Sequence, residues 1–415
     1  MTEYAEEGEA QRIADAVARR SYGKLVAFLS ARTRDVAAAE DVLSEAFVAA
    51  LVDWPRNGCP SNPEAWLLTV ARRKLIDSSR HQQRGENVAA QVELLTAGLD
   101  RTDEKAEIPD YRLGLMFACT HPAIDVGIRA PLMLQVVLGL NAQSIASTFL
   151  TSPSAMGKRL VRAKEKIRLA GVPLSIPGQE ELSARLDTVL DAIYAAFTEG
   201  WSDQGGTDQG RDDLTGEAIF LARLVTELLP DEPEALGLLA LILHAEARRP
   251  ARRTAGGEYV PLALQDQVTW DWAMIREGET LLRRASRAGV IGRYQLEAAI
   301  QSAHVFRCRT GRTNWVEIVH LYDALLGIVE TPVVRINRAL AIAEVDGAIL
   351  GLQAMPDAST DGRLREYQPY WAARADLLAR AGESDSASHA YDMAIGLETD
   401  PAVRRFLERR RTELK

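Results

Sequence analysis

Apolar residues recur at spacings of three and four along almost the whole chain, which is the period of one face of an α-helix. The clearest runs cover residues 13–29, 37–51, 65–75 and 132–137, and they are rich in alanine and leucine, both good helix formers. The alternating runs of β-branched residues that mark strands are nearly absent. The pattern therefore predicts an all-α protein.

Breaks in this pattern divide the chain into three helical parts. Proline, glycine and asparagine gather at 54–63, a predicted loop, and Asn62 with Pro63 has the pattern of a helix N-cap followed by proline in the first turn. The acidic, polar stretch 86–109 is expected to be a linker, and prolines at 173 and 177 mark a second boundary. We expect helical domains at 10–85, 110–172 and 180–415.

The third part contains a weak internal repeat. Gly311, Gly347 and Gly382 are 36 and 35 residues apart, and each ends one helical run and precedes another. From Trp371 to Pro401, small and apolar residues follow the spacing of a tetratricopeptide (TPR) repeat. Because one such unit cannot bury its apolar face alone, residues 180–415 are predicted to form a stacked, TPR-like helical array.

The net charge of −9 argues at first against a nucleic-acid partner. Residues 1–175, however, carry 22 Lys+Arg against 21 Asp+Glu, a net of +1, whereas residues 176–415 carry 27 against 37, a net of −10. The cations of the first part gather in two clusters, at 72–84 and 158–168. Because local positive density is what attracts a phosphate backbone, both clusters are candidate nucleic-acid surfaces.

The second cluster follows a predicted helix-turn-helix, with helices at 142–149 and 154–168 joined by a short turn. Thr151 or Ser152 can cap the second helix, and Pro153 suits its first turn. The start of such a helix faces base edges, and its later cations face phosphates. The candidate base-reading residues are Ser154, Ala155, Lys158 and Arg159, and the candidate phosphate-binding residues are Arg162, Lys166 and Arg168. The alternative is a solvated basic face.

The first cluster lies on the helix predicted after the proline-capped loop. One face carries Arg73, Asp77, Arg80 and Arg84, and it either binds DNA or forms a ladder of ion pairs one turn apart. Trp66, taken alone, is expected to be a core residue. The helix upstream is acidic on one face, which is either a solvated surface or a docking face for a basic partner. Its polar residues are Glu40, Asp41, Ser44 and Glu45.

The order of these segments resembles the bacterial RNA polymerase sigma factors of the extracytoplasmic-function (ECF) type. The resemblance is carried by AEDVLSEAF at 39–47, NPEAWLLTVARRKLID at 62–77 and LNAQSIASTFLTSPSAMGKRLVRAKEKIR at 140–168. Later motifs are similar to an ECF subgroup with a long TPR-like C-terminal extension. They are CTHPAI at 119–124, DAIYAAFTEGW at 191–201, EALGLLALILHAEARRPAR at 234–252 and RADLLARAGESDSASHAYDMAI at 374–395.

The resemblance implies an alternative sigma factor that binds core RNA polymerase and directs promoter-specific initiation. The acidic helix would bind the β′ clamp helices through Asp41 and Glu45, with Phe47 packed behind them. The residues implied at the −10 element, which domain 10–85 melts, are Asn62, Trp66, Arg72, Arg73, Asp77, Arg80 and Arg84. Those implied at the −35 element are Ser152, Ser154, Ala155, Lys158, Arg159, Arg162 and Lys166, and domain 110–172 would also meet the β flap.

Three positions depart from the family's pattern: Ala38, Ser44 and Arg73 stand where aspartate, glutamine and asparagine are usual. The C-terminal array is expected to regulate activity through an intramolecular or protein partner. The alternative function is a helix-turn-helix DNA-binding regulator with a TPR domain that senses a ligand or partner, not bound to polymerase.

The residues that carry other chemistries are scattered. Six histidines fall at no metal-ligand spacing, three cysteines form no framework, and no phosphate-binding glycine loop or nucleophile motif occurs. No run of about 18 apolar residues offers a membrane span. We therefore expect a cytoplasmic protein that is not an enzyme and that needs no cofactor, metal or membrane.

Overall fold

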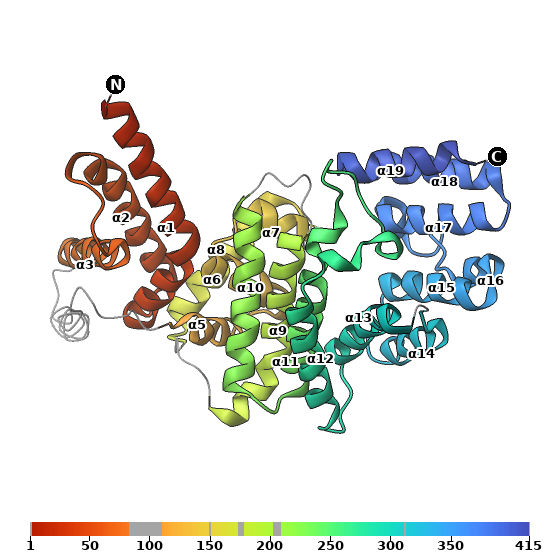
Figure 1. Ribbon diagram of the computed structural model, residues 1–415. Coiled ribbons are helices and arrows are strands. Elements are labelled where there is room, and N and C mark those ends of the chain that lie inside the picture. The colour runs from red at the N-terminus through yellow and green to blue at the C-terminus, as the bar shows by residue number, and fades with distance from the viewer. Residues whose placement is uncertain are drawn as a thin grey trace. The chain divides into compact units, whose positions relative to one another are not determined.

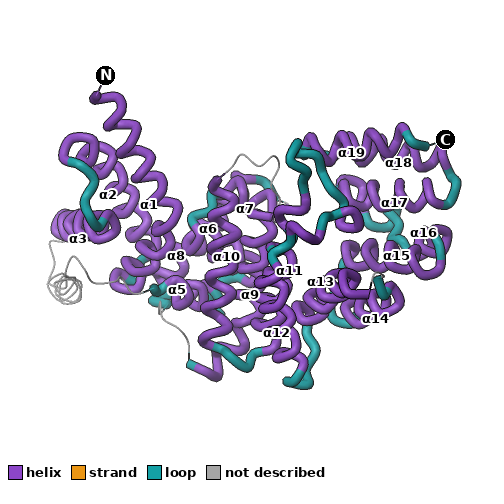
Figure 2. The backbone as a smooth tube through the Cα atoms, in the orientation of Figure 1, coloured by secondary structure: helices purple, strands orange, loops and turns teal. Residues whose placement is uncertain are grey.

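The computed structural model describes residues 2–82, 110–148, 151–172, 178–201, 209–310 and 313–414. Within these ranges the regular elements are helices, and one antiparallel bridge joins Arg253 to Tyr259 (Figure 2). The all-α prediction is confirmed. The chain forms two compact units, residues 1–201 with 209–221 and residues 202–208 with 222–415. The predicted linker at 86–109 lies outside the described residues.

The first unit contains the helices of both predicted N-terminal domains (Figure 1). Its helices are α1 (Thr2–Thr33), α2 (Val36–Asn57), α3 (Pro63–Gln82), α5 (Arg112–Cys119), α6 (Val126–Leu138), α7 (Ala142–Thr148), α8 (Pro153–Leu169), α9 (Gln179–Trp201) and the first part of α10 (Gln209–Leu228).

Helix α2 is longer than the sequence pattern predicted. It runs through Pro55 to Asn57, where the expected loop had already begun at residue 54. A proline in the last turn removes only one hydrogen bond near the helix end, so the helix continues past it. Gly58 ends the helix with φ +84°, a conformation that favours glycine, and its N–H donates to the Trp54 carbonyl.

The core of the first unit is built around the second half of α1. Residues Leu25 to Leu29 are buried in an unbroken run, with exposed fractions of 2% or less. A helix that is apolar on all sides must be covered on all sides. Helix α1 accordingly packs against α2 and α3 and also against α5 and α6. The predicted domains 10–85 and 110–172 thus share one core.

Helix α9 also belongs to this unit, although the sequence pattern had grouped residues from 180 onward with the C-terminal array. It packs on α5 and α6, and its residues Val189, Leu190 and Ile193 are buried. Helix α5 supplies the complementary apolar surface, because all eight of its residues are buried. Its one cation, Arg112, donates to Asp110 at 2.7 Å and also pairs with Glu217 of α10.

The second unit is a series of antiparallel helix pairs, as the repeat pattern predicted (Figure 1). Gly347 and Gly382 turn the chain between paired helices with φ of +95° and +84°, whereas Gly311 lies outside the described residues. The helices are α11 (Pro233–Glu246), α12 (Trp272–Ser286), α13 (Arg293–Thr310), α14 (Trp315–Leu326), α15 (Pro332–Asp346), α16 (Ala348–Ala354), α17 (Gln368–Arg380), α18 (Ser384–Leu397) and α19 (Pro401–Thr412).

Small residues set the spacing of these pairs, as expected for a helical repeat. A Cβ at Gly351 of α16 would lie 2.6 Å from the Cβ of Ala343 in α15, so the two helices approach more closely than any larger residue allows. Between α17 and α19, Ala375, Ala387, Ala390 and Ala394 surround buried Tyr391 in one cluster.

Candidate nucleic-acid interface

The start of α3 forms the edge of a cavity. Asn62 caps the helix by accepting a hydrogen bond from the Ala65 N–H at 3.1 Å, and Pro63 occupies the first turn, as the sequence predicted. The adjoining cavity has a volume of about 330 Å³. It is lined by Pro60, Ser61, Asn62, Ala65, Trp66, Leu68, Thr69, Val70, Arg72 and Arg73.

Four of the residues predicted to contact the −10 element therefore meet in one hollow: Asn62, Trp66, Arg72 and Arg73. Asp77 lies further along the same helix and is exposed. The side chain of Arg80 and the whole of Arg84 fall outside the described residues. The lining combines an aromatic ring, two guanidinium groups and an amide beside a helix N-terminus, groups that hold nucleobases and phosphates.

Trp66 is not a core residue, although a lone tryptophan in the sequence predicted one. Its ring packs edge-on against Trp54, with 5.6 Å between ring centroids and 63° between ring planes, and it is only half-buried. Trp54, at 2% exposed, is the core partner. A rigid buried ring thus holds Trp66 at the cavity wall.

Helix α2 presents a mixed acidic and apolar stripe to solvent. Asp41, Glu45, Val48 and Val52 follow each other at steps of four, three and four and are all exposed, the two valines at 63% and 55%. Glu45 also pairs with Lys74 of α3 at 3.0 Å. Phe47 lies behind the stripe, half-buried and stacked on Tyr22 of α1 with 6.5 Å between centroids.

Helix α8 is amphipathic, with a buried face of Met156, Leu160, Ala163 and Ile167. Ser152 caps it by accepting from the Ala155 N–H at 3.3 Å. The predicted DNA-contacting residues on its other face are exposed, apart from Arg159: Ser154, Ala155, Lys158, Arg162 and Lys166. The two helices predicted at 142–168 are thus α7 and α8, and residues 149–150 lie outside the described part of the chain.

Arg159, predicted to read bases, is engaged elsewhere. Its Nη2 donates to the carbonyl oxygen of Gly127 at the start of α6, at 2.7 Å. The same arginine lines a cavity of about 230 Å³ between α6 and α8, together with Ile124, Asp125, Ile128, Arg162, Ala163 and Lys166. A base contact by Arg159 requires this hydrogen bond to break.

Sequence reasoning missed the contact between α8 and α2. Lys164 of α8 donates to Glu40 of α2 at 2.7 Å, and both side chains are 14% exposed. The two residues are 124 positions apart, and Lys164 carried no separate prediction.

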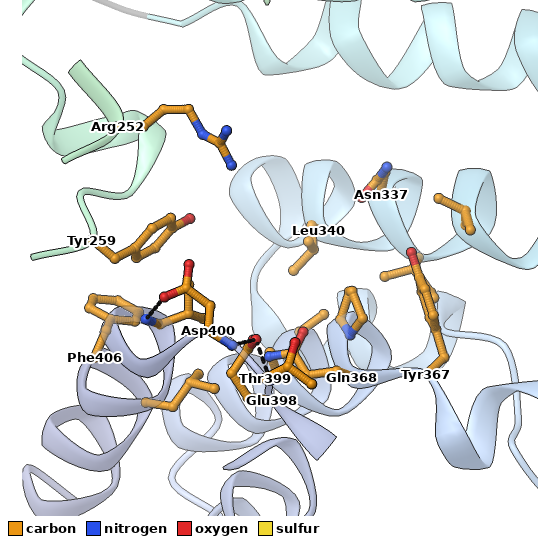
Figure 3. A pocket seen from close by; sticks show the side chains of 17 residues that line it. Arg252, Tyr259, Asn337, Leu340, Tyr367, Gln368, Glu398, Thr399, Asp400 and Phe406 are labelled. Carbon is orange, nitrogen blue, oxygen red and sulfur yellow. Dashed lines mark hydrogen bonds between the residues drawn. The ribbon is translucent and has the colours of Figure 1, made fainter. Parts of the chain in front are cut away.

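The second unit contains a larger cavity, of about 620 Å³, within the size range of ligand pockets (Figure 3). Its walls come from α15, α17, α19 and the segment 252–259, with apolar residues such as Leu340 and Phe406 beside polar ones such as Asn337 and Tyr367. The segment is fastened to α19, because Arg253 pairs with Asp400 at 2.5 Å and Glu258 with Arg405 and Arg409 at 3.0 and 2.8 Å.

A buried polar cluster joins α11, α12 and α13. His244 is fully buried, and its Nε2 lies 3.5 Å from Glu279, which accepts from the Ser302 hydroxyl. Burial lowers the pKa of His244 to about 4, so its ring is neutral at pH 7. Among the described residues no three His, Cys, Asp or Glu side chains are placed to hold a metal ion. No helix in those ranges is long and apolar enough to cross a bilayer.

Comparison with known proteins gives this arrangement a class. Residues 17–85, from the middle of α1 past the end of α3, match the family model for sigma-70 region 2. This match supports a sigma-factor role in transcription initiation, with core RNA polymerase and promoter DNA as the implied partners.

The C-terminal part and the whole chain have matches of their own. Residues 185–286 match a model described as a family of unknown function (DUF6596). An uncharacterized protein of Rhizobium meliloti (strain 1021) is 38% identical over 380 residues, which cover 90% of this chain and 89% of that protein. The chain belongs to the same family as that protein. No solved structure matches it.

Proposed function

We propose that this sigma factor is of the ECF type and directs initiation at a restricted set of promoters. In this proposal the cavity at the start of α3 captures an unstacked base of the −10 element, and α8 reads the −35 element. The observation that carries the proposal is the meeting of Asn62, Trp66, Arg72 and Arg73 around about 330 Å³ of accessible space. Strand opening requires such a pocket, because an extruded base loses stacking worth a few kcal/mol and needs new contacts.

The stripe on α2 supports docking to polymerase. It combines two carboxylates with two exposed valines on one face of a helix. Exposed apolar residues rimmed by charge are typical of protein interfaces. A basic partner helix, such as the β′ clamp helices of the family, fits that chemistry.

Transcription from two matched templates tests the proposal. Core polymerase with the full chain is expected to start from genomic promoter fragments, and Trp66→Ala is expected to lower initiation on duplex DNA at least tenfold. The same variant should recover most of its activity on a template with an unpaired −10 region, because the cost of opening has been removed. Equal loss on both templates would contradict a role in strand opening.

The other candidate, a helix-turn-helix regulator without polymerase, rests on the exposed basic face of α8. It predicts binding to duplex operators and no retention on core polymerase. A pull-down with purified core RNA polymerase distinguishes the two functions. The double charge-reversal variant of the α2 stripe, Asp41→Lys with Glu45→Lys, serves as the matched control.

We assign the second unit a regulatory role, with the cavity of about 620 Å³ as its candidate sensing site. Two carboxylates at the rim have partners within the chain: Asp400 pairs with Arg253, and Glu398 accepts the backbone N–H groups of Thr399 and Asp400 at 2.8 Å. The lining also places apolar side chains such as Leu340 and Phe406 beside polar ones such as Asn337, which is typical of a small-molecule site.

A further inference from the structure

A short hairpin in the second unit leaves the first helix pair and reaches the last helix. It consists of residues 252–260, and one antiparallel bridge joins Arg253 to Tyr259. Next to this bridge, the Val260 N–H donates to the Arg252 carbonyl at 2.8 Å. These bonds lie within the hairpin, so its shape does not depend on the helix that it reaches.

The base of the hairpin is anchored in the first helix pair, α11 and α12. Trp270, at 4% exposed, packs in one buried cluster with Ala247, Ala251 and Ile275. The Asp271 N–H, at the start of α12, donates to the Ala247 carbonyl at the end of α11 at 2.9 Å. The connection between α11 and α12 is thus fixed at both of its ends, and the hairpin projects from it.

Charged and aromatic side chains fasten the hairpin to α19, and we call these contacts the clasp. Its ion pairs are Arg253–Asp400 at 2.5 Å, Glu258–Arg405 at 3.0 Å and Glu258–Arg409 at 2.8 Å. Tyr259 adds an edge-on contact with Phe406, with 5.4 Å between ring centroids and 70° between ring planes. The carboxylate of Glu258 thus meets two arginines that lie one helical turn apart.

The clasp changes the topology of the array. In a linear helical array each repeat contacts its neighbours, and here too packing passes from α11 to α13, then through α14, α15, α17 and α18 to α19 (Figure 1). The clasp joins the two ends of this series, across 147 to 151 positions of sequence. It therefore closes the series of contacts into a ring.

The cavity of about 620 Å³ takes its walls from both ends of this ring. Arg252 and Tyr259 line it from the hairpin, Val403 and Phe406 line it from α19, and α15 and α17 complete it (Figure 3). The clasp thus holds two walls of the cavity together. A molecule that contacts both walls stabilises the closed ring, and closure in turn raises the affinity for that molecule, because linkage is reciprocal.

The ion pairs of the clasp are accessible to water. The side chains of Arg405 and Arg409 are 48% and 52% exposed, and that of Glu258 is 35% exposed. Exposed pairs each contribute little to stability and are screened by salt. The closed and open rings therefore differ little in free energy, so an occupant of the cavity can shift the balance between them.

We propose that the clasp is a switch in the second unit. In the closed ring the cavity is assembled; in the open array α19 separates from the hairpin, and the cavity loses one wall. The occupant that selects the closed ring is a small molecule that touches both Tyr259 and Phe406. The effect of this switch on transcription rests on the proposed function, whereas the opening and closing of the ring do not.

The test uses the full chain with Glu258→Gln, which keeps the size of the side chain and removes its charge. Native-state hydrogen exchange at 254–260 and 402–407 is expected to accelerate at least threefold. Raising NaCl from about 0.05 to about 0.5 M should accelerate the same amides in the wild type, and less so in the variant, because salt screens exposed pairs. The control is Asp323→Asn, which breaks a partly exposed pair with Arg338 at 2.5 Å between neighbouring helices and should leave both segments unchanged.

A charge-reversed clasp excludes misfolding as the cause. Glu258→Arg combined with Arg405→Glu and Arg409→Glu should restore slow exchange. Fast exchange in this triple variant, or unchanged exchange in Glu258→Gln, would mean that the ion pairs do not hold the ring closed, and either result overturns the proposal.

Transcription with core polymerase tests the regulatory part. Output with Glu258→Gln is expected to differ at least threefold from the wild type. Faster exchange with unchanged output would mean that the clasp only supports the fold, which overturns the switch. If the wild type itself supports no transcription, the sigma-factor function fails, and the exchange results decide on the ring alone.

Discussion

The substitution Gly23→Ala tests the packing of α1 on α6, because the packing decides whether the added methyl group stabilises or destabilises the first unit. Gly23 lies inside helix α1, where alanine is intrinsically favoured over glycine by about 1 kcal/mol. The added methyl, however, would collide with the backbone carbonyl of Val137, which is not a flexible side chain that can move aside. Overpacking of this kind costs about 1–3 kcal/mol. The first unit is therefore expected to lose up to about 2 kcal/mol of stability.

Gly216→Ala in α10 is the matched control. Gly216 is also helical, but a Cβ there meets nothing within 4 Å. The same replacement is expected to stabilise its helix by about 1 kcal/mol, because only the helix preference remains. The difference between the two substitutions, about 1–3 kcal/mol, isolates the collision.

Native-state hydrogen exchange is the appropriate assay, because a chain with two compact units does not unfold in one transition. Amides at 25–29 in α1 and 132–137 in α6 report the contact, and a loss of 1.4 kcal/mol appears as a tenfold faster exchange. If Gly23→Ala slows the exchange of these amides instead, α1 and α6 are not packed on each other in solution.

Two further predictions concern the second unit. The pKa of His244 is about 6.5 in the unfolded state and about 4 in the folded state, so the unfolded state binds more protons between these values, and the free energy of unfolding should fall as the pH drops from about 6.5 to about 4. In urea unfolding, the stability advantage of the wild type over His244→Leu should shrink across that window. A constant difference would contradict the neutral state assigned to the folded histidine. Ala372→Trp, which fills the cavity of about 620 Å³, should change transcription output at least threefold, whereas the control Ser386→Trp on the exposed face of α18 should not. Equal output from the two variants would argue against a regulatory site in this cavity.

The features that sequence reasoning predicted correctly are local ones. The caps at Asn62 and Ser152 depend on residues within three positions, so the pattern Asn-Pro or Ser-Pro before a helix is sufficient. The turns at Gly347 and Gly382 need a positive φ, and glycine signals that directly. Asn62, Trp66, Arg72 and Arg73 line one cavity because they lie within 12 positions of each other, in the loop before α3 and on α3 itself.

The features that escaped prediction depend on distant partners. Six cations on α8 look equally solvated in sequence, and nothing local distinguishes Lys164, which meets Glu40, or Arg159, which meets the Gly127 carbonyl. The ion pair between Arg253 and Asp400 joins residues that are 147 positions apart. Helix α9 has the same apolar period as the array that follows it, so only the packing of its buried face on α5 and α6 reveals its unit.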